Sequence, residues 1–144
     1  MLIRLICILI PVSFLFACAQ ENGSSAEAVA ESAAAEAAPT VGDPEKGKRF
    51  YIFCQACHSI NAGGMNKVGP NLHGFIGSAA AQAEGFIYSD ALAAAGITWD
   101  EATIDRWITR PSATVPGTTM VFAGIIDPQQ RADLIAYLKQ AGSE

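Results

Sequence analysis

The hydrophobic and polar positions divide the chain into three parts. Residues 5–19 form an apolar run behind a single arginine, which is shorter than the roughly twenty residues of a membrane span and typical of an export leader. Residues 20–41 are mainly Ala, Glu and Ser, so they cannot bury enough apolar surface to fold and predict a flexible linker. The pattern therefore predicts a leader over 1–19, a linker over 20–41 and one folded domain over 42–144.

Four segments of the domain combine helical spacing of apolar residues with residues that begin or end helices. A capping aspartate is twice followed by proline, which suits a first helical turn, and no segment alternates convincingly with period two. The predicted helices start at Asp43, at Ser89 or Asp90, near Asp100 and at Asp127, and the last three stop at Gly96, before Pro111 and at Gly142. We therefore expect an all-α fold of about four helices, with residues 112–125 in a loop.

The composition of the chain argues against nucleic-acid binding and indicates that the folded domain needs a cofactor or a cross-link. Hydrophobic residues make up 51% of the chain but aromatic residues only 8%, and alanine and the leader supply most of the excess. From residue 40 onward eight Lys/Arg accompany ten Asp/Glu, so we expect no nucleic-acid partner. A small, loop-rich helical domain with few large apolar side chains needs a disulfide, a metal or a cofactor to complete its core.

Two cysteines and a histidine stand together in "FCQACHSI", residues 53–60. A structural zinc site needs four ligands, and His58 directly follows Cys57, which makes the two awkward ligands of one tetrahedral ion. A thiol–disulfide site is typical of a βαβ context, which the sequence lacks. Thiols at Cys54 and Cys57 lie on one side of a helical turn and can bond the two vinyl groups of one porphyrin. The motif therefore predicts covalently attached haem c, with His58 on the iron.

The leader contains a third cysteine of interest. "LFAC" resembles a bacterial lipobox and would make Cys18 a lipidated first residue, although Phe16 is bulky for that motif, whereas "ACA" before Gln20 resembles an ordinary cleavage site. An uncleaved anchor is the third possibility. All three place the domain on the periplasmic side, either tethered to the membrane or soluble.

The iron needs a ligand opposite His58. Met65 and His73 are close in sequence to the proximal side, whereas Met120 follows two predicted helices on a loop that turns at Pro116 and Gly117. We therefore predict Met120 as the distal ligand, with Val121 and Phe122 anchoring its loop in the core. A thioether opposite histidine raises the reduction potential. A six-coordinate iron is closed to substrates, which favours electron transfer over catalysis.

With these residues in place, the sequence resembles class I cytochrome c, of the mitochondrial type and its alphaproteobacterial relatives. The similar stretches cover essentially all of residues 42–144: "CQACH", "GPNLHG", "GFIYSDALAAAGITW", "VPGTTMVFAGI" and "DLIAYLK". The resemblance implies helices around one covalent haem, with the N- and C-terminal helices crossing. Their contact positions would be Gly47 and Phe50 in the first helix, and Leu134 and Tyr137 in the last.

The resemblance also implies roles for individual residues. Cys54 and Cys57 would form the thioethers, and His58 and Met120 would be the axial ligands. The carbonyl of Pro70 would accept the ring N–H of the proximal histidine. The side chains that the resemblance places near the haem propionates or the distal side are Tyr88, Trp99, Thr118 and Trp107.

Three positions depart from the family pattern. Ser78 replaces an arginine near a propionate, Leu92 replaces an asparagine, and Thr119 replaces the lysine before the methionine. The lysine ring that docks acidic partners is therefore sparse. Its remaining cations are Lys48, Lys67, Arg106 and Arg110, with Lys67 expected near the haem edge by analogy.

The resulting prediction is a monohaem one-electron carrier whose iron alternates between Fe(III) and Fe(II), and not an enzyme. The expected donor is a cytochrome bc complex or a dehydrogenase, and the expected acceptor a terminal oxidase, peroxidase or reductase. Two alternatives remain. One is a peroxidase or ligand sensor with a labile distal site, and the other is an electron-entry subunit of a dehydrogenase.

Overall fold

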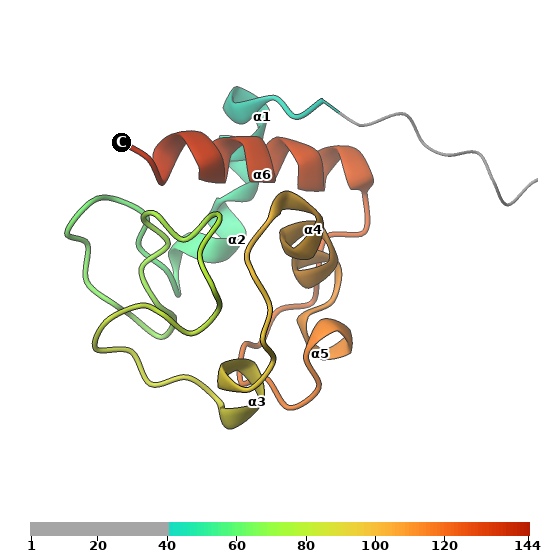
Figure 1. Cartoon of the computed structure of the whole chain (residues 1–144). Coiled ribbons are helices and arrows are strands. Elements are labelled where there is room, and N and C mark those ends of the chain that lie inside the picture. Colours follow the sequence, from blue (N-terminus) through green and yellow to red (C-terminus); the bar gives the residue numbers. More distant parts are fainter. Residues whose placement is uncertain (1–40) are drawn as a thin grey trace, which may run out of the picture. The chain divides into compact units, whose positions relative to one another are not determined.

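The computed structural model describes residues 41–144, which contain six helices (Figure 1). Their bounds are Pro44–Phe50 (α1), Ile52–Gln55 (α2), Asp90–Ala93 (α3), Glu101–Thr109 (α4), Pro111–Thr114 (α5) and Pro128–Ala141 (α6). The expected leader over 1–19, with Cys18, and the expected linker over 20–41, apart from its last residue, lie outside the described residues. The helical content agrees with the predicted all-α class.

The four predicted helices correspond to α1, α3, α4 and α6, and each begins where a side chain caps it. Asp43, Ser89, Asp100 and Asp127 accept hydrogen bonds from backbone N–H groups of the first turn, which are the groups that lack a partner inside the helix. The predicted loop over 112–125 was wrong at its start. Pro111 begins a short helix there, because its fixed φ suits a first helical position.

The first and last helices cross at very close range. A Cβ added to Gly47 would lie 1.9 Å from the carbonyl oxygen of Asp133, so only a glycine lets the two backbones meet at this point. One turn further along, the rings of Tyr51 and Tyr137 pack with centroids 5.4 Å apart. Figure 1 shows α1 lying across α6. The predicted crossing is thus confirmed.

A buried carboxylate fixes the same junction. Asp133 is 3% exposed, and its Oδ1 accepts hydrogen bonds from the backbone N–H of Asp43 (2.8 Å) and from Nε2 of Gln129 (2.8 Å). Nε2 of Gln129 also donates to the carbonyl of Val41. The start of α1 is therefore held to α6 by polar contacts as well as by packing.

The core lies between α4, α6 and the long loops. Ile104, Trp107 and Leu134 are buried there, and residues 56–89 contribute turns and partly buried aromatic residues. One isolated bridge pairs Ala79 with Thr98. None of the helices between residues 41 and 144 is long and apolar enough to cross a membrane.

The capping aspartates predict how stability depends on pH. The backbone N–H of Lys46 lowers the pKa of Asp43, and the backbone N–H of Thr103 lowers the pKa of Asp100. A carboxylate whose pKa is depressed on folding stabilises the fold above its unfolded pKa of about 3.9, and this contribution is lost as the pH falls through the folded value. Urea unfolding at a series of pH values should therefore show less acid destabilisation in Asp43→Asn/Asp100→Asn, which keeps neutral caps, than in the unaltered chain. An equal loss in both proteins would contradict this.

Candidate cofactor site

A short helical segment positions the two cysteines. The N–H groups of Cys57 and His58 both donate to the carbonyl of Cys54, at 3.0 and 2.9 Å, so the chain turns through one helical turn across the motif. Both thiols are free and partly buried. Burial, followed by the charge of Cys57, raises the pKa of Cys54 to about 11. The two cysteines therefore lie one helical turn apart, Cys54 within α2 and Cys57 just beyond it.

The imidazole of His58 is oriented by a backbone carbonyl. Its Nδ1 lies 2.7 Å from the carbonyl oxygen of Pro70. Because a carbonyl can only accept, Nδ1 carries the proton and Nε2 keeps a free lone pair. Burial lowers the pKa of His58, the Pro70 carbonyl raises it, and the charge of Lys67 lowers it again. The net lowering keeps the ring neutral, which is the form that binds a metal.

Gly69 supports the same ring, and the sequence reasoning missed it. A Cβ at this position would lie 2.3 Å from Cε1 and 2.7 Å from both nitrogen atoms of His58. The N–H of Gly69 also donates to the carbonyl of Cys57 at 2.8 Å. The imidazole thus rests directly on the Gly69 backbone. The available signal was a glycine just before Pro70 in "VGPNLHG".

Two more residues that hold the histidine segment were not predicted in this role. The hydroxyl of Tyr51 donates to the carbonyl of His58 at 3.1 Å. The ammonium of Lys67 donates to the carbonyls of Gln55 (2.7 Å) and His58 (3.3 Å). Lys67 was expected near the haem edge as a docking cation, and its Nζ hydrogen-bonds to backbone carbonyls at and just beyond the end of α2, where a cation is favourable.

One cavity of about 400 Å³ brings the predicted site residues together, and this volume is within the usual range for a bound cofactor. Its lining includes eight of the nine residues that were expected around the haem in the described chain: Cys54, Cys57, His58, Pro70, Tyr88, Trp99, Thr118 and Met120. Trp107, the ninth, also lines the cavity, and its ring packs edge-on against Trp99 with centroids 5.3 Å apart. No Lys, Arg, Asp or Glu within residues 41–144 lines the cavity.

Met120 lies in the cavity wall, partly buried. Its backbone N–H donates to Oγ1 of Thr118 at 3.3 Å. Phe122 packs against the core as predicted, but the expected core role of Val121 was wrong, because its side chain is 99% exposed. Among the alternative ligands, Met65 is 82% exposed and outside this cavity, whereas His73 lies in the lining but is exposed.

Three positions of the wall differ in what they can offer a bound anion. The hydroxyl of Tyr88 accepts from the N–H of Ala83 at 3.1 Å, and burial raises its pKa, so its proton stays available for donation. Ser78 donates its proton to the carbonyl of Phe75 at 2.6 Å. Leu92 is buried and offers no polar group.

The cavity fits a haem c. Its walls are mostly apolar and aromatic, two thiols stand a helical turn apart at one edge, and a neutral imidazole leaves one nitrogen free. Gly69 makes the space in which that imidazole sits. The helical fold and this cavity together define a c-type cytochrome, a protein that carries a covalent haem and transfers electrons.

The comparisons with known proteins agree. The family model "Cytochrome c" matches residues 44–142. The chain is 48% identical over 104 residues to cytochrome c of Theileria annulata, covering 72% of this chain and 90% of that protein. It is 44% identical over 112 residues to cytochrome c2 of Blastochloris viridis, covering 77% and 88%. The structure of cytochrome cH from Methylobacterium extorquens matches with a TM-score of 0.65 at 45% identity, covering 69% of this chain and 99% of that one.

The chain belongs to the cytochrome c family. It therefore carries one covalently bound haem c with its iron, and it is an electron carrier.

Proposed function

We propose that this protein shuttles single electrons on the periplasmic side, with Cys54 and Cys57 in thioether bonds to the haem and the iron held between His58 and Met120. One observation supports this above all others: a single uncharged cavity is lined by both thiols, by a neutral imidazole with a free Nε2 and by one partly buried thioether. The haem supplies the Fe(III)/Fe(II) couple. The chain supplies attachment, ligands and an environment that excludes water.

The residues around the cavity favour a carrier over an enzyme. The His58 ring is fixed between the Pro70 carbonyl and the Gly69 backbone, and Met120 stands in the wall, where it would close the distal position. A peroxidase or ligand sensor needs that position open. The deciding measurement is the absorption spectrum of the oxidised holoprotein at neutral pH. We expect the methionine-to-iron charge-transfer band, whereas high-spin ferric iron would favour the alternative.

The partners that this proposal implies are membrane complexes. The donor would be a cytochrome bc complex or a dehydrogenase, and the acceptor a terminal oxidase, peroxidase or reductase. A lipid on Cys18 or an uncleaved leader would keep the domain at high local concentration near them. Mass spectrometry of the mature N-terminus distinguishes a lipidated Cys18, a free Gln20 and an intact leader. If the protein instead co-purifies with a dehydrogenase from a membrane preparation, it is a bound subunit of that enzyme and not a free shuttle.

The small number of cations near the cavity predicts a weak dependence of partner association on salt. Thr119, which is uncharged, stands exposed beside Met120, and Lys67 is the one cation expected near the haem edge. Steering by charge is the part of association that ionic strength screens. Between about 20 and 200 mM salt, the second-order rate of electron transfer to an acidic partner should change only a few-fold. Thr119→Lys should make this rate depend more steeply on salt. If the unaltered protein shows a dependence as steep as that of the variant, the prediction is wrong.

A further inference from the structure

The segment that presents Met120 has few hydrogen bonds of its own. Between residues 116 and 124 of the described chain, two are formed: the N–H of Thr118 donates to the carbonyl of Val115, and the N–H of Met120 donates to Oγ1 of Thr118. The position of the thioether therefore depends on how the two ends of the segment are held.

Both ends are attached to α4. Before the segment, Oγ1 of Thr114 donates to the carbonyl of Arg106 at 3.0 Å, and Val115 is buried. After it, the N–H of Ile125 donates to the carbonyl of Ile108 at 2.9 Å. Gly124 lies so close to α4 that an added Cβ would be 2.0 Å from the carbonyl oxygen of Thr109. The helix thus serves as the platform for the methionine.

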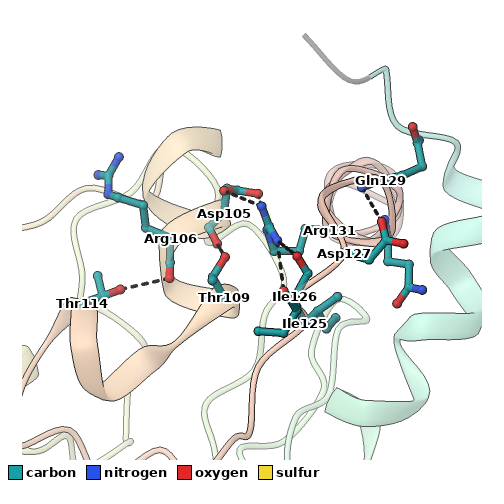
Figure 2. Close-up of polar contacts among 10 residues, drawn as sticks. Asp105, Arg106, Thr109, Thr114, Ile125, Ile126, Asp127, Gln129 and Arg131 are labelled. Atoms are coloured by element: carbon teal, nitrogen blue, oxygen red, sulfur yellow. Dashed lines mark hydrogen bonds and ion pairs between the residues drawn. The ribbon is translucent and has the colours of Figure 1, made fainter. Parts of the chain in front are cut away.

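Arg131 of α6 joins this platform to the downstream end of the segment. Its Nε donates to Oδ1 of Asp105 on α4 at 2.7 Å, and its Nη1 donates to the carbonyls of Ile125 (3.1 Å) and Ile126 (2.7 Å). Figure 2 shows the guanidinium lying between the Asp105 carboxylate and these two carbonyls. The Arg131 side chain is 12% exposed and that of Asp105 40%, so the donor is largely shielded from water, and its charge makes these hydrogen bonds stronger than neutral ones.

We propose that Arg131 is a positioning residue for Met120: its guanidinium holds the end of the methionine segment against α4 and so keeps the thioether at the iron. This rests on the proposed ligand role of Met120. The planar fork of an arginine can bond a carboxylate and two carbonyls at once, which the single ammonium of a lysine does less well. Loss of the side chain frees the Ile125 and Ile126 carbonyls, so at its downstream end the segment keeps one hydrogen bond to α4, from the N–H of Ile125 to the carbonyl of Ile108.

The test measures how fast imidazole displaces the methionine from the ferric holoprotein, followed by loss of the charge-transfer band. Arg131→Met should raise the displacement rate about tenfold, since two carbonyl hydrogen bonds to a charged donor are lost. Arg131→Lys should show an intermediate rate. Asp105→Asn, which keeps the carbonyl bonds and loses only the ion pair, should raise the rate about threefold. It also provides a milder change if Arg131→Met folds poorly.

The matched control is Lys139→Met. Lys139 forms the other ion pair between α6 and α4, with Glu101, and within the described chain it makes no hydrogen bond or ion pair to the methionine segment. Its displacement rate should equal that of the unaltered protein. If Arg131→Met gives the same rate as Lys139→Met, the positioning role is overturned while the carrier function stands. If the unaltered protein lacks the charge-transfer band, the ligand assignment and the positioning role both fail.

Discussion

Met120→Ala should lower the reduction potential of the holoprotein by on the order of 0.2 V, a sizeable part of the roughly 0.8 V range that axial ligands span. A thioether is a soft ligand that stabilises ferrous iron. Without it, water or another hard ligand takes the distal position and stabilises ferric iron. The same change should remove the charge-transfer band and let the ferric protein bind cyanide rapidly. Potentiometric titration followed by absorption measures the potential.

Met65→Ala is the matched control for this prediction. Met65 is 82% exposed and lies outside the cavity that Met120 lines, so its replacement should leave the potential and the band unchanged. If Met65→Ala removed the band and Met120→Ala did not, the distal assignment would be wrong. If neither did, His73, which also borders the cavity, would become the candidate.

The sequence predicted those parts of the fold that local chemistry determines. The capping aspartates Asp43, Asp100 and Asp127 mark helix starts because each bonds N–H groups two or three residues ahead. The Cys-x-x-Cys-His spacing predicted the cofactor for the same reason, since one helical turn sets the separation of the thiols. Local chemistry does not predict that Pro70 and Met120 lie at the haem. That expectation came from the family resemblance and, for Met120, also from the turn at Pro116 and Gly117.

What the sequence could not predict depends on contacts between distant segments. Nothing near Lys67 indicates that its ammonium bonds the carbonyls of Gln55 and His58, and a lysine on a loop suggests a solvent-exposed charge. In the sequence, Arg131 looks like an ordinary polar residue on a surface helix. Only the folded structure shows that it contacts Asp105 and the Ile125 carbonyl. The outward orientation of Val121 is likewise set by the path of the loop.

Gly69→Ala should disturb the side of the haem that His58 occupies, because the added methyl group would meet the His58 ring. Its Cβ would lie 2.3 Å from Cε1 of His58, closer than atoms in contact allow. The ring cannot move away freely, since Pro70 holds Nδ1 and Cys57 holds the adjacent backbone. We expect a loss of about 2–4 kcal/mol in the free energy of unfolding and a reduced fraction of chains with attached haem.

Gly63→Ala separates this clash from the general cost of replacing a loop glycine. Gly63 has φ +67° and no atom within 4 Å of an added Cβ, so its replacement should cost about 1–2 kcal/mol from backbone strain alone and leave the haem spectrum unchanged. Denaturant unfolding measures the stability, and the pyridine haemochrome spectrum measures attachment. Equal stability losses in the two variants with normal attachment in both would mean that the His58 ring does not rest on Gly69 in the holoprotein. A spectral change confined to Gly69→Ala would instead show that the glycine determines where the proximal imidazole lies.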